Sequence, residues 1–169
     1  RVGAVRSAVP FLTRTDFFVQ LVGAFMGMFG YAALSQRIGR KPALALVIGL
    51  AFVAVQSAFW GLRDPLSAYL LAFPMGVFCL APFAAYAVYF PELYPTRLRA
   101  TGVGFCYNCA RILAAGAPFA LGKLAQHFAD PIDETMGIRK AATIVAFIYF
   151  VGFAGLLFAP ETRGKPLPE

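Results

Sequence analysis

Charged side chains are scarce in this sequence. They make up 14% of its 169 residues, against about 25% in an average soluble chain. Residues of the hydrophobic set make up 60%, against roughly 45–50% in soluble proteins, and the mean hydropathy is +0.70. A chain with so little polar surface cannot enclose a core and stay soluble in water. The composition therefore excludes an ordinary soluble domain and predicts a polytopic membrane protein.

Reactive side chains are equally sparse within the long apolar stretches. The chain has one histidine and three cysteines, and no apolar stretch contains a cluster of His, Asp and Glu or a nucleophile beside a base. The cysteines lie inside apolar stretches, which favours packed free thiols over a disulfide or a metal site. We therefore expect no catalytic site, no metal and no cofactor, and a protein that is not an enzyme.

The net charge of +7 has a similarly limited meaning. A basic chain can indicate nucleic-acid binding, but here the Lys and Arg residues lie mostly in short connections between apolar runs and form no continuous stripe. We therefore expect no nucleic-acid partner. The expected surroundings are the lipid bilayer of a cell membrane (inner or plasma membrane) that the chain crosses several times.

Five stretches are long and apolar enough to cross a bilayer. Lipid admits only helices and closed barrels, a helical span needs ~20 mostly apolar residues, and the sequence lacks the ten-residue alternation of barrel strands. The sequence therefore predicts an all-α membrane protein with five transmembrane helices. Their approximate bounds are 16–34, 43–62, 66–90, 101–126 and 141–160.

Glycines and prolines inside these stretches predict close packing and bends. Gly23 and Gly27 lie four residues apart, a spacing that lets two helix backbones approach closely in lipid. We prefer this packing interpretation over a role in ligand binding. Pro82 interrupts the third stretch, and Pro118 with Gly116 is expected to kink the fourth.

A lone arginine inside the fourth stretch is the central observation. Arg111 lies about ten residues in, ~15 Å at 1.5 Å per residue, near the middle of a ~30 Å hydrocarbon core. An arginine there costs about 2.5–3.5 kcal/mol on insertion scales and normally faces the bundle interior or a water-filled cavity. Tyr107 and Asn108 share its helix face, and a guanidinium beside a phenol and an amide suits a carboxylate. The alternative is a structural arginine that pairs with a buried acid or with helix carbonyls.

Two further polar side chains could line the same cavity. Tyr86 in the third stretch carries a hydroxyl that requires a partner, and Gln20 is a polar side chain within the first stretch. The candidate substrate-binding residues are therefore Arg111, Asn108, Tyr107, Tyr86 and Gln20.

The connection at 34–42 reads LSQRIGRKP. Its cations Arg37, Arg40 and Lys41 cannot stay in hydrocarbon, and Gly39 permits a tight reversal. On composition alone it is either a positively charged anchor or a functional motif. The cations on this side lie in shorter loops and almost all acids lie on the opposite side, which favours the cytoplasm for Arg37 and, with it, for the C-terminus.

Three segments resemble motifs of the major facilitator superfamily. LSQRIGRK is similar to the inter-helix loop motif G-x-x-x-D-R-x-G-R-R/K, with Ala32 at the glycine and Gln36 at the aspartate. PELYPTRLRATG resembles the PE-x-[YF]-P-T-x-x-R loop of metabolite:proton symporters and their sugar-porter relatives. PETRGK resembles the PET-[KR]-G tail that follows their last span. In this order and spacing, the three segments resemble the carboxy-terminal half of such a transporter.

The resemblance implies that residues 1–169 are a partial C-terminal transporter domain. The five spans would be helices eight to twelve of twelve and would form most of the C-terminal six-helix bundle, and the amino-terminal half of the same transporter would be the missing partner. The resemblance also implies a cytoplasmic charge network that latches a gate. Its members would be Glu92, Arg97 or Arg99, and Arg37 and Arg40 around Gly39.

The activity that the resemblance implies is secondary active transport by alternating access. The stretch leading to Arg111 looks closer to organic-acid symporters than to sugar porters, which typically carry a tryptophan before the PE loop, whereas Trp60 lies elsewhere. We expect a symporter of a small organic solute with H⁺, the solute being a carboxylate or another organic anion. The alternatives are a sugar or neutral-metabolite porter of the same superfamily, and a membrane structural or assembly subunit. No acid lies mid-span, so either a proton carrier is expected in the missing half or proton coupling is absent.

Overall fold

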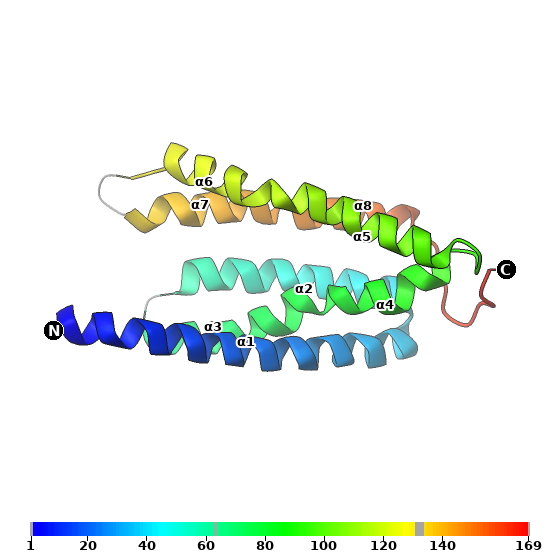
Figure 1. Ribbon diagram of the computed structural model, residues 1–169, viewed down its shortest axis with the longest axis horizontal. Helices are drawn as coiled ribbons and strands as arrows, with labels where there is room; N and C mark the ends of the chain where they lie inside the picture. The colour runs from blue at the N-terminus through cyan, green and yellow to red at the C-terminus, as the bar shows by residue number, and fades with distance from the viewer. Residues whose placement is uncertain (1, 63, 131–133, 169) are drawn as a thin grey trace.

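The computed structural model describes residues 2–62, 64–130 and 134–168, and within these ranges it contains eight helices and no strand. The long helices run roughly along one axis, and the chain ends near the corner where the first two helices meet (Figure 1). The helices are α1 (Val2–Ile38), α2 (Arg40–Gly61), α3 (Pro65–Leu80), α4 (Pro82–Leu93), α5 (Arg99–Ala115), α6 (Ala117–His127), α7 (Glu134–Ala146) and α8 (Ile148–Phe158). The predicted all-α class is confirmed.

Three short breaks divide longer rods into pairs of helices. α3 and α4 meet at Ala81, just before Pro82, whose missing N–H and fixed φ suit the first turn of a new helix. α5 and α6 meet at Gly116, just before Pro118. Both interruptions were predicted from these prolines. The third break, at Phe147 between α7 and α8, contains no proline and was not predicted; there the Phe147 N–H donates to Ile144 O at 3.1 Å in a tighter turn.

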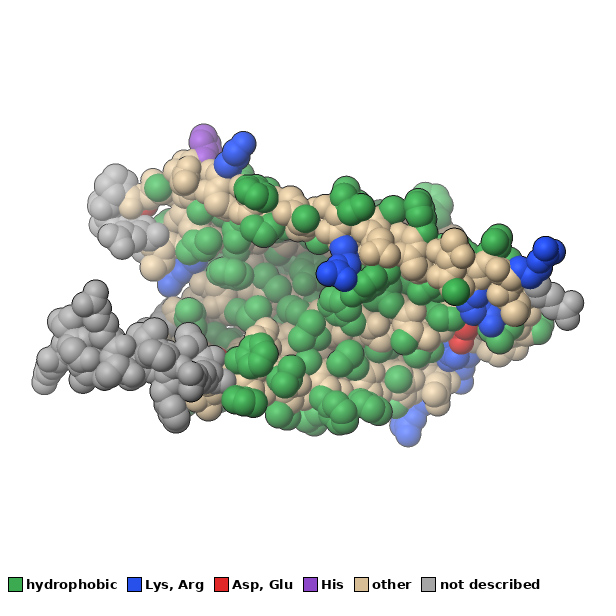
Figure 2. All heavy atoms as spheres, in the orientation of Figure 1, with side chains coloured by type: hydrophobic (Ala, Val, Ile, Leu, Met, Phe, Trp, Pro, Cys, Tyr) green, Lys and Arg blue, Asp and Glu red, His purple; other side chains and the backbone are tan. Residues whose placement is uncertain are grey.

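The described residues contain four helical segments that are long and apolar enough to cross a membrane. They are Thr15–Ile38, Arg40–Gly61, Leu66–Leu93 and Thr135–Phe158. Large apolar side chains lie exposed, as in Leu113 at 81% and Phe158 at 90% exposure. Figure 2 shows hydrophobic side chains spread along the molecule, with most Lys and Arg side chains toward its two ends and one near the middle. The chain is therefore a multi-pass membrane protein.

The rod made by α5 and α6 coincides with the predicted span 101–126, but it is not among those four. Asn108, Arg111 and Lys123 make it more polar than the other rods. The prediction of five spans is thus confirmed for four segments, and the crossing by α5 and α6 stays a prediction.

Two predicted connections are shorter in the structure. α1 continues to Ile38 and α2 begins at Arg40, so the connection expected over 34–42 is Gly39 alone, with φ of 106°. α4 continues to Leu93, so Glu92 lies on a helix and not in a loop.

Glycines bring the backbones of α1 and α3 into contact. A Cβ added to Gly23 would lie 2.5 Å from Phe73 O, and one added to Gly27 would collide with the backbone of Val77. Gly76 of α3 lies equally close to α1, because a Cβ added to Gly76 would collide with Gln20 O. The packing face predicted from Gly23 and Gly27 is confirmed.

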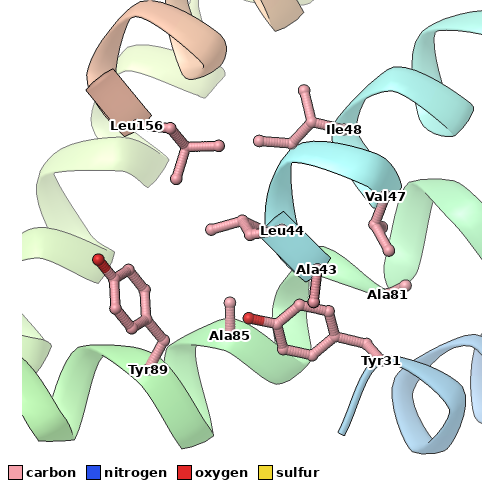
Figure 3. Close-up of a cluster of buried hydrophobic side chains, with 9 residues drawn as sticks. All are labelled: Tyr31, Ala43, Leu44, Val47, Ile48, Ala81, Ala85, Tyr89 and Leu156. Atoms are coloured by element: carbon pink, nitrogen blue, oxygen red, sulfur yellow. The ribbon is translucent and has the colours of Figure 1, made fainter. Parts of the chain in front are cut away.

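The buried core lies around α2, which contacts α1, α3, α4, α7 and α8. Figure 3 shows its largest cluster, in which α2 side chains meet two tyrosines, one from α1 and one from α4. The cluster contains Tyr31, Ala43, Leu44, Val47, Ile48, Ala81, Ala85, Tyr89 and Leu156. By contrast, α5 contacts only α4 and α6 among the described helices, and none of its residues is buried.

Candidate functional site

An ion pair between α2 and α4 lies at the end of the molecule where α1 turns into α2. Arg40 Nη2 lies 2.7 Å from Glu92 Oε1, and Arg40 Nε donates to Glu92 Oε2 at 3.0 Å. The two side chains are only 16% and 18% exposed. Two parallel contacts of this kind fix geometry as well as energy. We call the group formed by Arg40, Glu92, Glu161, Thr162 and Arg163 the corner cluster.

Glu161, which follows the last helix, binds the start of α2. Its carboxylate accepts hydrogen bonds from the backbone N–H groups of Arg40 at 2.9 Å and Lys41 at 3.0 Å. It also accepts from the N–H groups of Thr162 at 3.1 Å and Arg163 at 3.0 Å. The first N–H groups of a helix lack partners within it, and the helix dipole favours an anion there. Partial burial opposes ionisation of Glu161, but these four donors outweigh it and hold the pKa of the carboxyl below its usual range.

Three more contacts tie the tail to the helices. The Thr162 hydroxyl donates to Glu92 Oε2 at 2.5 Å, and the Tyr89 hydroxyl donates to Pro160 O at 2.5 Å. The Arg163 guanidinium donates to the carbonyl of Arg37 at the last turn of α1. The tail thus places an acid at the start of α2 and a base at the end of α1, which matches both helix dipoles.

The candidate gate residues do not all come together. Arg40 and Glu92 form the ion pair, and Gly39 permits the close approach of Glu161, whose Oε2 would lie 2.7 Å from a Cβ at that position. Arg37 contributes its carbonyl, and its side chain is exposed.

Arg97 and Arg99 stand apart from this group. Arg99 donates to the hydroxyl of Thr96 at 3.3 Å, Arg97 is exposed, and in the described part of the chain neither pairs with Glu92. Of the cations that the resemblance implied for Glu92, the structure therefore brings Arg40 to it and leaves these two outside.

Sequence reasoning missed the tail as part of this cluster. From the sequence, the segment from Pro160 to Lys165 was identified only as a motif after the last span, yet Glu161 and Thr162 are half-buried. The only signal was the PET motif itself, because nothing else in the sequence around Glu161 indicates that its carboxylate caps another helix.

Around Arg111, two helices contribute aromatic side chains. The Arg111 guanidinium carbon lies 5.6 Å from the ring centre of Tyr107, a cation–π distance. The ring of Tyr107 meets that of Tyr86 on α4 edge to face, with centres 5.4 Å apart. Tyr86 in turn contacts Phe90 at 4.8 Å. We call Arg111, Tyr107 and Tyr86 the Arg111 group.

The Arg111 group is open on one side. Arg111 and Asn108 are exposed, and within the described ranges Arg111 has no acidic partner. The Asn108 amide donates to Gly104 O of its own helix at 2.8 Å, which leaves the amide oxygen available as an acceptor. A charged donor, an amide and two phenols therefore lie along one side of α5 and α4 without a counter-ion.

Gln20 lies elsewhere. It lines a cavity of about 330 Å³ between α1, α2 and α3, together with Asp16, Phe59, Leu71 and Met75. Since α1 and α5 do not contact each other, the structure does not bring Gln20 to the Arg111 group. The other four candidate residues lie on α4 and α5.

The cysteines have a feature that the sequence interpretation overlooked. Cys106 and Cys109 stand in a Cys-x-x-Cys spacing on α5. Both are free thiols, as is Cys79. The Tyr94 hydroxyl lies 2.9 Å from Cys106 Sγ, and the described residues contain no group of three or more His, Cys, Asp and Glu side chains that could hold a metal.

Comparison with known proteins gives relatives along most of the chain. A protein of Cupriavidus pinatubonensis named "Probable 4-methylmuconolactone transporter" is 34% identical over 148 residues, which is 87% of this chain and 33% of the relative. Synaptic vesicle 2-related protein of Xenopus laevis is 34% identical over 156 residues, 92% of this chain and 27% of the relative. Organic cation/carnitine transporter 7 of Arabidopsis thaliana is 26% identical over 157 residues, 91% and 29% respectively. No family model matches the chain.

A bundle of long apolar helices with a charge cluster at one end defines a multi-pass membrane protein. The relatives support the resemblance that the three motifs indicated: the chain is similar, along most of its length, to proteins named as transporters, as expected for a chain that resembles the major facilitator superfamily. It spans about one third of the length of the curated relatives it matches. None of the three relatives is named as an enzyme, in agreement with the expectation from the sequence.

Proposed function

We propose that the chain is part of a secondary active transporter that moves a small organic anion, a carboxylate, together with a proton by alternating access. One observation carries the proposal: an exposed guanidinium on α5 is flanked by Tyr107 and has no acidic partner in the described residues. A carboxylate matches the fork of donors that arginine presents. The relative named for a lactone transporter supports a small organic solute.

The depth of Arg111 supports this role. It lies twelve residues after Arg99 at the start of α5 (111 − 99), which is about 18 Å along the helix. If α5 and α6 form the fifth span, this depth puts the guanidinium near the middle of a ~30 Å hydrocarbon core, where substrate sites of secondary transporters lie. Arginine is tolerated at such depth when it faces a watery cavity.

Each neighbour of Arg111 then has a role. The Tyr107 ring supports the guanidinium from one side, and Tyr86 supports Tyr107 in turn. The free amide oxygen of Asn108 would accept a hydrogen bond from a hydroxyl of the solute or from the protonated acid. Gln20 would contribute only if the solute pathway also reaches the cavity on α1.

The corner cluster is proposed as the latch of the cytoplasmic gate. It joins the α1–α2 corner, the end of α4 and the tail through hydrogen bonds to charged groups, and such bonds are stronger than neutral ones. A group that can be closed or open in one step is suited to separate two states of a transporter. Arg37, Gly39, Arg97 and Arg99 lie at the same end; for Arg97 and Arg99 a contact with the latch remains a prediction.

The chain alone is not expected to transport. Its relatives are about three times as long, and α5 leaves its outer face uncovered, with Phe105, Ile112 and Leu113 exposed. We propose that the amino-terminal half of the transporter supplies the other wall of the solute cavity and the proton carrier.

Uptake of a labelled monocarboxylate by the full-length transporter in proteoliposomes tests the proposal. Wild type is compared with Arg111→Lys and Arg111→Gln, and with Lys123→Gln as a matched loss of one exposed cation on the same rod. We expect Arg111→Gln to abolish uptake, Arg111→Lys to retain weak uptake because the charge stays while the fork is lost, and Lys123→Gln to behave as wild type. Normal carboxylate uptake by Arg111→Gln would reject the anion site and favour a sugar or another neutral solute.

A further inference from the structure

A cavity of about 330 Å³ lies between α1, α2 and α3, at the end of the molecule opposite the corner cluster (Figure 1). Two of the side chains that line it are polar, Asp16 and Gln20. They lie four residues apart on α1 and therefore share one face of that helix. The remaining lining residues are all apolar, and they include Phe59, Leu71 and Met75. The cavity thus combines one carboxylate and one amide with an apolar wall.

The Asp16 carboxylate has no partner that balances its charge in the described part of the chain. Its Oδ1 is covered by protein atoms and accepts no hydrogen bond there, and no described Lys, Arg or His forms an ion pair with it. Arg139 reaches the nearby end of α2, but its guanidinium donates to Leu62 O at 3.4 Å. A covered carboxylate oxygen without a donor costs free energy. A donor that enters the cavity would therefore be bound favourably by this residue.

The lining side chains restrict the class of donor that fits. A hard metal ion such as Ca²⁺ or Mg²⁺ needs about six or more oxygen ligands, whereas only Asp16 and Gln20 bring side-chain oxygens to the cavity. A primary ammonium group needs fewer acceptors, because one N–H can donate to the carboxylate and a second to the amide oxygen. An apolar chain on the same molecule would pack against Leu71 and Met75, and the Phe59 ring can attract the positive charge.

We propose that this cavity is a second binding site, which takes a small primary ammonium compound with an apolar chain and holds it through Asp16 and Gln20. An organic anion of the kind proposed for Arg111 would be repelled by Asp16. Because α1 and α5 do not contact each other, the two sites are separate and take ligands of opposite charge. The inference goes beyond the proposed function and does not rest on it.

Occupancy of the cavity can be followed in the full-length transporter in detergent. Met75 lines the cavity, so the resonance of its ¹³C-labelled methyl group, assigned by its absence in Met75→Leu, reports a bound molecule. The probe is butylammonium, and n-butanol is its uncharged match. We expect a saturable shift with butylammonium and at least tenfold weaker binding of n-butanol. Asp16→Asn should raise the Kd of butylammonium at least tenfold, the effect of losing a hydrogen bond to a charged group, and Gln20→Leu should raise it about threefold.

Asp64→Asn is the matched control for the loss of one negative charge. Asp64 is an exposed acid before the start of α3, at the same end of the molecule, and asparagine can replace it as the N-cap of that helix. This variant should bind butylammonium as wild type does. Arg111→Gln should also bind it as wild type does, so the result is independent of whether the anion site proposed at Arg111 exists.

Absence of a saturable Met75 shift in wild type would overturn the inference. Equal affinity for butylammonium and n-butanol would also overturn it, because the cavity would then be only an apolar pocket. The same holds if Asp64→Asn weakens binding as much as Asp16→Asn, since the effect would then be one of overall charge. If Asp16→Asn does not fold, Ala72→Leu replaces it, because Ala72 lines the cavity and the larger side chain would occupy the space of the ligand; unchanged affinity in that variant overturns the inference as well.

Discussion

Arg40 and Arg111 are arginines of one chain in opposite surroundings. The Arg40 guanidinium contacts Glu92 and also donates to Ser35 O at 3.2 Å, in a side chain that is 16% exposed. Arg111 is exposed, rests against the ring of Tyr107, and has no acid beside it in the described residues. The chemical type of the side chain is the same. Its partners decide whether it holds the fold together or remains available to a solute.

The two regions also differ in how their parts depend on one another. The corner cluster joins α2, α4 and the tail, and each carboxylate in it accepts hydrogen bonds from several donors. Loss of one member leaves others buried without a partner, so the effects of single substitutions should not add. Around Arg111, by contrast, the contacts are those of the guanidinium with the Tyr107 ring and of that ring with Tyr86. Loss of the guanidinium would leave no opposite charge without a partner among the described residues.

The largest effect on stability is expected from Arg40→Gln. Glu92 would keep its half-buried carboxylate and lose both contacts to the guanidinium, at a cost of about 2–3 kcal/mol of unfolding free energy, the usual range for hydrogen bonds to charged groups. Thermal unfolding of the full-length protein in detergent measures this. Lys41→Gln is the matched control. The Lys41 side chain donates to Leu157 O at 3.3 Å, and its replacement should change stability by less than about 0.5 kcal/mol.

The reversed pair Arg40→Glu with Glu92→Arg sharpens this result. If the ion pair is the source of the stability that Arg40→Gln loses, the reversed pair should recover part of it. The recovery should be incomplete, because the Thr162 hydroxyl would then face a cation. Equal unfolding temperatures for wild type and Arg40→Gln would show that the corner cluster is not a stabilising unit.

A smaller, pH-dependent effect is expected from Glu161. Its pKa is lowered in the folded state, so the carboxylate contributes stability that is fully present above its unfolded pKa of about 4.3 and is lost as the pH falls through the lower folded value. Glu161→Gln cannot titrate. Unfolding temperatures of both proteins between pH 7 and pH 3 should therefore differ at neutral pH and converge in acid, whereas parallel curves would mean that the carboxylate charge does not support the start of α2.

The features that sequence reasoning predicted are those that depend on local patterns. Long apolar runs predicted the helices, Pro82 predicted the break before α4, and the four-residue spacing of Gly23 and Gly27 predicted a close helix contact. Each of these follows from chemistry within one segment. The break at Phe147 has no proline to signal it, and it was missed.

The features that depend on contacts between distant segments were only partly predictable. The motif resemblance implied that Arg40 and Glu92 belong to one charge network. It named Arg97 and Arg99 as partners of Glu92 on the same basis, and the structure pairs Glu92 with Arg40. Glu161 lies 121 residues from the N–H that it caps, and no spacing in the sequence indicates which helix start an acid after the last span will reach. Helix periodicity predicted that Tyr107 and Asn108 lie beside Arg111. That Gln20 lies apart from them could be seen only from the packing of α1 against α2 and α3.

The smallest effect on stability is expected from Arg111→Gln, and it tests the contrast between the two arginines most directly. The substitution removes a cation–π contact to Tyr107, which at an exposed site is worth about 0.5–1 kcal/mol, and also removes the cost of holding a charge within the membrane. The two terms oppose each other, so the unfolding temperature of the full-length protein without solute should stay close to that of wild type. Added carboxylate should then raise the unfolding temperature of wild type, because a ligand stabilises the state that binds it, and leave that of Arg111→Gln unchanged. Destabilisation by Arg111→Gln as large as that by Arg40→Gln would instead make Arg111 a second structural arginine, with a partner outside the described chain.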